Sequence, residues 1–317
     1  MAAPLALGID IGGTNTVFGL VDIDGTIYFR HSLSTKSYEE ASLLVDAIAG
    51  IVHNNIPPNH ELVGIGIGAP NGNYYSGCIE FAPNLPWAGT IPLTAMFAKV
   101  FGLPATLTND ANAAAVGEMI YGAAKGMKDF IMITLGTGLG SGIVVNGEVL
   151  YGHMGNAGEL GHTIVYPGGR ECGCGRNGCL ETYASATGIT RTVIELLSSN
   201  KTESSLRNIS VTDLNSKIIY NAACQGDPIA LEAFDFTCKV LGMQLADAVA
   251  FSGPEAIILF GGLANAKEFI LEPTRLYMED SILRVYKDTV KILPSELPES
   301  DAALLGAAAL MSKLLLF

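Results

Sequence analysis

The chain has few charged residues and lacks a long apolar run. Only 15% of its 317 residues are charged and 49% are hydrophobic, a balance that could suggest a membrane protein. No apolar run reaches the roughly 18 residues that a membrane helix needs, and Ser312 and Lys313 interrupt the apolar C-terminus. The N-terminus lacks a basic segment, and Asp10 breaks its apolar stretch, so we expect no signal peptide. We therefore expect a cytoplasmic protein without a membrane partner.

Positive charge is scarce as well. The formal net charge is −13, so the average field repels nucleic acid, and we expect no nucleic-acid partner. A phosphate ligand would be repelled too, unless backbone N–H groups in Gly-rich turns and at helix N-termini gather around it. The 37 glycines, with many alanines, indicate buried strands and closely packed helices.

The familiar phosphate-binding motifs are also missing. The chain contains no GxxxxGK[ST] loop and no GxGxxG segment that opens a helix. Residues 136–142 superficially resemble a dinucleotide fingerprint, but the sequence after them predicts a strand. A Rossmann site is therefore excluded.

A pattern of strand, Gly-rich turn, strand and hairpin turn occurs twice. It covers residues 5–33, with Gly12-Gly13-Thr14-Asn15 as the turn, and returns at 129–151 with Gly136-Thr137-Gly138. A period this long indicates two similar domains rather than a solenoid. The remaining pattern predicts strands at 62–69, 105–109 and 256–260, and helices at 38–53, 92–101, 111–121, 185–198, 211–225, 228–252 and 301–315.

Asp10 and the turn after it form a candidate phosphate and Mg²⁺ site. Asp10 ends a buried strand and is followed by the amides of Gly12 and Gly13 and the hydroxyl of Thr14. In phosphoryl transfer the carboxylate would orient Mg²⁺ through water, while the hydroxyl and the amides hold phosphate oxygens. A plain hairpin with a solvated Asp is the alternative. The motif gains specificity beside the second Gly-rich turn and Gly261-Gly262.

Asn109 and Asp110 lie where a predicted strand ends and an Ala-rich helix begins. A carboxylate there feels the positive end of the helix dipole, which keeps it ionised and able to accept a proton. That suits a general base for a sugar hydroxyl. A simple N-cap is the alternative, and the local sequence alone favours it.

One histidine and three cysteines cluster on short Gly-rich loops, where they offer the ligand set of a closed tetrahedral zinc site: His162, Cys172, Cys174 and Cys179. A disulfide, or cysteines that pack in the core, are the alternatives. We favour zinc because Cys-Gly-Cys spacing suits a metal better than a disulfide ring. Glu159 and Glu181 bracket the cluster, which suggests that the metal holds still a loop whose polar groups read a ligand.

Other polar and aromatic side chains have two readings each. Trp87, the only tryptophan, follows Asn84 in a Pro-rich loop and could line a sugar site or pack on its domain. Glu159 and Glu181 could bind hydroxyl groups or could be surface acids.

Taken together, these motifs resemble the ROK group of sugar kinases (repressors, open reading frames and kinases), and most of all bacterial glucokinases. The most specific part is Gly158-Glu159-Leu160-Gly161-His162 with the cysteine segment, and the resemblance runs from about Leu5 to Leu310. It implies an α/β fold of the actin-like ATPase (ribonuclease H-like) type, with two similar domains around a cleft. The smaller domain would hold residues 1–120 plus 300–317, and the larger, residues 121–299, would carry the zinc-binding insertion.

The resemblance also implies a role for each candidate residue. Asp110 would be the base that takes the proton of the sugar 6-hydroxyl as it attacks ATP. His162 would touch zinc with one ring nitrogen and sugar with the other. Sugar hydroxyls would be bound by Asn84, Asn109, Asp110, Glu159, His162 and Glu181, and the nucleotide with Mg²⁺ by Asp10, Gly12, Gly13, Thr14, Gly136, Thr137, Gly138, Gly261 and Gly262.

One departure from the family concerns the sugar. Many relatives carry Pro-Gly-Pro where this chain has Pro70-Asn71-Gly72-Asn73-Tyr74, in a loop close to the sugar. We expect a homodimeric, ATP-dependent glucokinase of glycolysis. Fructose, mannose or an N-acetylhexosamine are alternative substrates, and polyphosphate is an alternative donor. A sugar-responsive regulator of the same family would need an N-terminal helix-turn-helix, whereas here a core strand begins by residue 5. The zinc cluster argues against an actin-like chaperone or filament protein.

Overall fold

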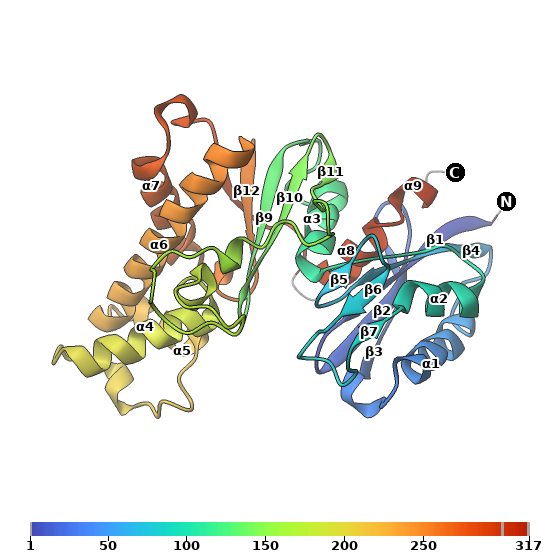
Figure 1. Ribbon diagram of the computed structural model, residues 1–317, viewed down its shortest axis with the longest axis horizontal. Helices are drawn as coiled ribbons and strands as arrows, with labels where there is room; N and C mark the ends of the chain where they lie inside the picture. Colours follow the sequence, from blue (N-terminus) through green and yellow to red (C-terminus); the bar gives the residue numbers. More distant parts are fainter. Residues whose placement is uncertain (1, 299–300, 316–317) are drawn as a thin grey trace. The chain divides into compact units, whose positions relative to one another are not determined.

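The computed structural model describes residues 2–298 and 301–315, which divide into two compact units (Figure 1). Unit 1 comprises the described residues of 1–126, 149–157 and 296–317, and unit 2 comprises 127–148 and 158–295. Residues 149–157 thus group with unit 1, although they fall inside the range that the sequence analysis assigned to the larger domain.

Unit 1 is built on a five-stranded sheet with the order β3-β2-β1-β4-β8. Strands β1, β4 and β8 are parallel, and β2 and β3 are antiparallel additions at one edge. The strands are β1 (Ala3–Ile11), β2 (Asn15–Val21), β3 (Ile27–Ser34), β4 (His60–Gly68) and β8 (Ala105–Thr108), and a small second sheet holds β5 (Gly72–Asn73), β6 (Cys78–Glu80) and β7 (Thr90–Ile91). The helices are α1 (Ala41–His53), α2 (Leu93–Phe101), α3 (Asp110–Tyr121), α8 (Ala302–Ala309) and α9 (Ser312–Leu315), with a 3₁₀ turn at Thr35–Ser37.

The two faces of this sheet are packed in different ways, because successive side chains of a strand point to opposite faces. Ile65 and Ile67 of β4 join the apolar core that includes side chains of α1 and α2. Gly66, which lies between them, faces α8, where an added Cβ would collide with the carbonyl oxygen of Ala307. A similar close approach joins Gly117 of α3 to Gly306 of α8. Small residues therefore let α8 lie directly against the sheet and α3 lie directly against α8 (Figure 1).

Unit 2 repeats the arrangement with the order β11-β10-β9-β12-β13, in which β9, β12 and β13 are parallel and β10 is antiparallel to β9. Its strands are β9 (Phe130–Leu135), β10 (Leu139–Val145), β11 (Glu148–Val149), β12 (Ala256–Phe260) and β13 (Lys291–Pro294). Its helices are α4 (Ala186–Ser199), α5 (Ser216–Cys224), α6 (Pro228–Ser252) and α7 (Leu271–Ser281), with 3₁₀ turns at Leu160–His162, Leu180–Thr182, Ser205–Asn208, Ala264–Phe269 and Arg284–Tyr286. The core contains residues of β9 and β12 and of these four helices.

Several boundaries differ from those predicted. The helix predicted at 211–225 begins only at Ser216, because Asn215 caps it by accepting a hydrogen bond from the amide of Ile218. The closing helix predicted at 301–315 is two helices that break at Leu310 and Met311. Helix α7 and strand β13 were not predicted. None of the helices in the described ranges is both long and apolar enough to cross a membrane.

Candidate active site and metal centre

In unit 1 the two candidate carboxylates lie beside each other at the carboxyl end of the parallel strands. Asp10 of β1 pairs in register with Gly68 of β4, and Gly68 pairs with Thr108 of β8. A Cβ placed on Gly68 would lie 4.0 Å from Oδ1 of Asp10 and 3.9 Å from Cα of Asp110. Glycine at this position therefore leaves room for both acidic residues at one edge of the sheet.

The pKa values of both carboxyl groups are raised. Loss of solvation raises the pKa of Asp10 to about 7, with a further contribution from the negative charge of Asp110. The Asp110 side chain reaches solvent, but surrounding protein raises its pKa by desolvation, more than the amide of Ala111 lowers it. The helix start thus does not hold Asp110 at a low pKa, in contrast to the expectation from its position. A raised pKa suits a general base, which must accept a proton near neutral pH.

Asn109, rather than Asp110, is the N-cap of α3. Its Oδ1 accepts a hydrogen bond from the amide of Asn112 at 2.7 Å, so Asp110 is the first helical residue. The cap therefore uses the Asn109 oxygen and leaves the Asp110 carboxylate for other chemistry.

The turn after β1 contacts the loop that carries Asn84. The amide of Gly12 donates to the carbonyl of Asn15 at 3.0 Å, and a Cβ on Gly13 would lie 2.6 Å from the carbonyl oxygen of Asn84. Asn84 is exposed, whereas Trp87 is buried and donates its indole N–H to the carbonyl of Tyr38 at 3.0 Å. Trp87 is therefore a core side chain and not part of a sugar site.

In unit 2 the Gly136-Thr137-Gly138 turn and Gly261-Gly262 lie side by side, because they follow the adjacent parallel strands β9 and β12. A Cβ on Gly261 would lie 2.8 Å from the carbonyl oxygen of Leu135, the residue before Gly136. Gly136 and Gly262 differ from Gly261, because a Cβ on either would meet no described atom within 4 Å. Both therefore border open space, as a backbone phosphate cradle requires.

Gly138 lies against Glu181, which adjoins the cysteine cluster. A Cβ there would lie 2.5 Å from Oε2 of Glu181, and Oε1 of the same carboxylate accepts from the thiol of Cys172 at 2.9 Å. Glu181 thus stands between the 136–138 turn and the cysteine cluster.

The four predicted metal ligands come together. Their ligand atoms all lie within 4.8 Å of one another, with 3.6 Å from Cys172 Sγ to His162 Nδ1 and 3.6 Å between the Sγ atoms of Cys174 and Cys179. Ligands about 2.3 Å from a tetrahedral zinc ion lie about 3.7 Å apart, whereas a disulfide would need about 2.05 Å. All four cysteine and histidine side chains thus fit a zinc ion, and the three cysteines are free thiols.

The surroundings of the cluster shift the pKa values of its three thiols in opposite directions. Arg176 lowers the pKa of the Cys174 thiol to about 6, whereas burial raises the pKa of Cys172 and of Cys179. The two buried thiols would ionise at a cost that a metal ion offsets. Nδ1 of His162 faces the cysteines, and its Nε2 lies 3.9 Å from Oε2 of Glu159. The histidine can therefore bind a metal with one nitrogen and leave the other for a ligand.

Two supporting residues were missed by the sequence analysis. Ser141 of β10 is buried, donates its hydroxyl to the carbonyl of Gly158 and accepts from the amide of Leu160 at 3.1 Å, which anchors both neighbours of Glu159. Arg170 donates twice to Glu195 of α4, at 2.8 and 2.6 Å, and ties the cysteine loop to that helix. Ser141 lies in the Gly-Ser-Gly segment, whose sequence resembles only a dinucleotide fingerprint and gives no sign of this role.

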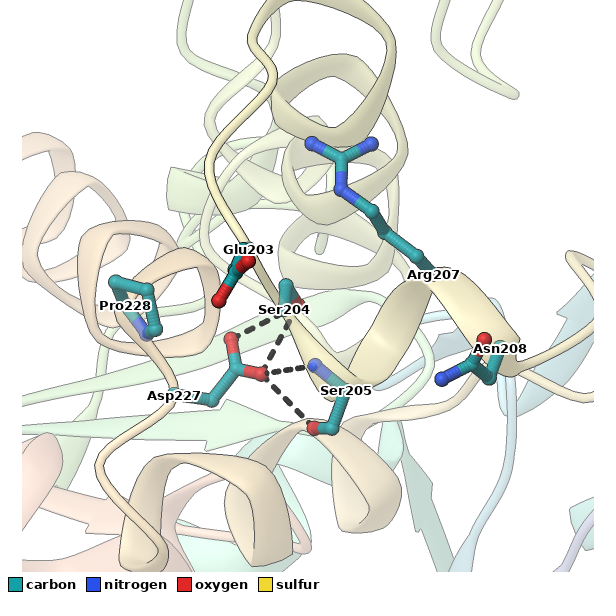
Figure 2. Close-up of a pocket in the computed structure, with 7 residues that line it drawn as sticks. All are labelled: Glu203, Ser204, Ser205, Arg207, Asn208, Asp227 and Pro228. Carbon is teal, nitrogen blue, oxygen red and sulfur yellow. Dashed lines mark hydrogen bonds between the residues drawn. The ribbon is translucent and has the colours of Figure 1, made fainter.

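An open pocket of about 730 Å³ lies elsewhere in unit 2 and contains none of the predicted site residues (Figure 2). Its lining residues are Glu203, Ser204, Ser205, Arg207, Asn208, Asp227 and Pro228. The carboxylate of Asp227 caps α6 and accepts hydrogen bonds from Ser204, from the hydroxyl and amide of Ser205, and from two helix amides. Its bonding capacity is used by the protein itself, so we assign the pocket a structural role.

The sequence model of the ROK family matches residues 6–314. This chain belongs to the ROK family. The glucokinase of Streptomyces coelicolor is 36% identical over 312 residues, 96% of this chain and 97% of that protein. The glucokinase of Halalkalibacterium halodurans is 35% identical over 314 residues, 97% of this chain and 94% of that protein. A solved ROK family glucokinase from Streptomyces griseus, in complex with glucose and AMPPNP, has 35% identity and a TM-score of 0.79, and the match covers 96% and 98% of the two chains.

Membership of the ROK family confirms the resemblance seen in the sequence. The fold is that of the actin-like ATPases, as predicted, and the common strand order of the two sheets is its duplicated element. The two glycine hairpins of this ROK protein open the two halves of that duplication.

Proposed function

We propose that this chain transfers the γ-phosphoryl group of ATP to the 6-hydroxyl of glucose. The observation that carries the proposal is the nearly full-length similarity to glucokinases, one of them in complex with glucose and AMPPNP. The geometry of each unit supports the same chemistry, since unit 1 offers a carboxylate of raised pKa and unit 2 offers Gly136 and Gly262, which border open space.

Asp110 is the proposed base. Its carboxylate takes the proton of the 6-hydroxyl while that oxygen attacks the γ-phosphorus and the bond from phosphorus to the β-phosphate oxygen breaks. Burial raises the pKa of Asp110 and so increases its affinity for this proton, and the charge of Asp110 adds in turn to the raised pKa of Asp10. The protein contributes mainly position and electrostatics to the reaction.

Backbone groups rather than a lysine are proposed to hold the donor. No lysine or arginine adjoins Gly136-Thr137-Gly138 or Gly261-Gly262, and the chain is acidic overall. We assign Gly12, Gly13 and Thr14 to phosphate oxygens and Asp10 to the Mg²⁺ site. Mg²⁺, when bound, neutralises charge on the phosphate oxygens.

The zinc site is proposed to be structural, with His162, Cys172, Cys174 and Cys179 as ligands. A four-ligand site leaves no open position for catalysis. Its role is to hold Glu159, His162 and Glu181, which we propose bind sugar hydroxyls together with Asn84 and Asn109. A buried polar group left unpaired by the wrong sugar costs binding energy, which favours glucose over an acetamido sugar.

We also retain the homodimer as a proposal. Unit 2 exposes large apolar side chains on α6, α7 and the segment after it, such as Phe251, Leu276 and Val285, and exposed apolar surface is typical of association sites. Sedimentation at several concentrations would show a monomer if this is wrong.

A coupled assay tests the proposed function. Glucose, mannose, fructose and N-acetylglucosamine would each be offered with ATP and with polyphosphate, and kcat/KM compared. We expect the highest value for glucose with ATP. A higher value for N-acetylglucosamine would keep the kinase and reject glucose as substrate, and no turnover with any pair would reject the kinase.

A further inference from the structure

Asn73 connects two segments of unit 1 that are far apart in the sequence. Its side chain is 6% exposed, and its Nδ2 donates to the carbonyl of Met154 at 2.8 Å and to Oε2 of Glu80 at 3.3 Å. Its Oδ1 accepts from the amides of Tyr75 and Ser76 at 3.0 and 3.3 Å. Every polar atom of this carboxamide is therefore used, and one bond reaches 81 residues along the chain.

The packing around this bond is equally close. A Cβ on Gly155, which has a φ of +81°, would lie 2.5 Å from the Asn73 carboxamide oxygen. The rings of Tyr74 and Tyr151 stack with centroids 4.0 Å apart and planes at 6°. Such ring pairs contribute about 0.5–1.5 kcal/mol beyond their buried area. The loop after β4 thus contacts residues 151–155 in three ways: the Asn73–Met154 hydrogen bond, the close approach of Gly155 to Asn73, and the Tyr74–Tyr151 ring stack.

The loop after β4 and residues 149–157 both adjoin residues that we assign to the reaction. The loop begins directly after Gly68, which borders Asp10 and Asp110. Residues 149–157 run within two positions into Glu159, whose neighbours are held in turn by Ser141. The Asn73 contact therefore holds the chain just before it enters the Glu159–His162 segment.

We infer that Asn73 is a positioning residue for the hexose, which acts through residues 151–157 on Glu159 and His162, with the Tyr74–Tyr151 stack as its partner. This inference rests on the proposed function. It also gives a physical role to the loop in which this chain departs from the Pro-Gly-Pro of many relatives.

Asn73→Asp tests the inference, because it keeps the shape of the side chain but removes the donor and places a carboxylate against the Met154 carbonyl and Glu80. We expect the KM for glucose to rise about tenfold or more, with kcat and the KM for ATP within about threefold. Hydrogen exchange of the amides at 156–163 should become faster. Tyr151→Ala should act in the same direction, and Tyr151→Phe, which keeps the ring, should recover most of the loss.

Ser76→Ala is the matched control, since Ser76 donates to the same Glu80 at 2.8 Å but does not bond to residues 149–157 in the described chain. It should lower stability slightly and leave the KM for glucose unchanged. Equal effects of Asn73→Asp and Ser76→Ala on that KM would overturn the inference, as would unchanged exchange at 156–163. A wild-type protein that phosphorylates no hexose would contradict the proposed function instead, because the exchange comparison needs no turnover.

Discussion

Asp10 and Asp110 repel each other at the edge of the unit 1 sheet, and each has a separate task in the proposed reaction. Desolvation is the first cause of the raised pKa of both residues. For Asp110 a raised pKa improves a base, whereas for Asp10 it opposes the ionised form that a Mg²⁺ site needs.

Asp110→Asn should keep the fold and lose turnover. An amide cannot accept the hydroxyl proton, and loss of a general base costs on the order of 10²–10⁴-fold in rate. We expect kcat for glucose to fall by that amount, while calorimetry shows glucose binding close to that of wild type. Near-normal turnover would show that another group is the base.

Asp10→Asn should change how stability depends on pH. The pKa of Asp10 rises from its ordinary value of 3.8 to about 7 in the folded protein. Between these values the folded state binds more protons than the unfolded state, so the free energy of unfolding falls as pH rises through this window. The shift corresponds to about 4 kcal/mol at most, which partial solvent contact reduces to roughly 2 kcal/mol.

Urea unfolding at pH 4 and pH 8 measures this effect. We expect Asp10→Asn to be more stable than wild type at pH 8 by that amount and nearly equal to it at pH 4. The control is Asp46→Asn, which removes an exposed carboxyl group from α1. Parallel pH profiles of wild type and Asp10→Asn would contradict the raised pKa of Asp10, of which burial is the first cause.

At the scale of elements, the proposed binding groups lie on glycine turns at the ends of parallel strands and on the loops of the cysteine cluster. Gly138 is an unsuitable probe of the nucleotide, because a side chain there would strike Glu181 and disturb the sugar ligands as well. Gly262 is a better probe, since an added Cβ would meet only open space.

Gly262→Ala should raise the KM for ATP by about tenfold and spare the KM for glucose. The methyl group would occupy space close to the proposed phosphates without straining the protein. Steady-state kinetics with each substrate varied would measure it. Gly50→Ala on α1 is the control, because its Cβ also meets open space and its only expected effect is about 0.5–1 kcal/mol of added helix stability. An unchanged KM for ATP would show that the nucleotide does not bind next to the turn after β12.

Zinc should be present at one ion per chain by elemental analysis. Cys174→Ser should lower the free energy of unfolding by on the order of 3 kcal/mol and raise the KM for glucose, because the loop that carries Glu181 loses its anchor. Cys224→Ser, which changes an exposed cysteine outside the cluster, should behave as wild type. Metal-free protein with normal stability and sugar affinity would refute the site.

At the scale of the whole molecule, the chain order and the two units do not coincide. Unit 1 is made of three segments of the chain and unit 2 of two. Helix α8 covers the sheet face on which β1 and β4 carry glycines, and it comes about 240 residues after β4 in the chain. Its backbone atoms lie close to Gly8 and Gly66.

Residues 1–126 expressed alone should therefore not form a stable domain. Without α8 and the residues after it, the sheet exposes Gly8, Gly64 and Gly66 together with the neighbouring apolar surface. We expect weak cooperativity in urea unfolding, and recovery of a cooperative transition when residues 296–317 are joined by a flexible linker. A cooperative transition of the shorter fragment would show that α8 is dispensable.

Local features of the sequence determined the two hairpins, the strand end that carries Asp10, the helix start at Asp110, and the cluster of His162 with three cysteines. Each is encoded within about twenty neighbouring residues by turn glycines, apolar periodicity or ligand spacing. The same information missed α7 and β13, whose segments carry weaker patterns. It also identified the helix start at 109–110 correctly, but not which of the two residues is the cap.

Only the tertiary structure decided which reading of an ambiguous residue holds. It placed Trp87 in the core, raised the pKa of Asp110 against the pull of its helix, put Gly138 against Glu181, and joined Asn73 to Met154. These outcomes depend on desolvation and on contacts between segments far apart in the chain. A linear pattern does not contain them, because burial and distance arise only when the chain has folded.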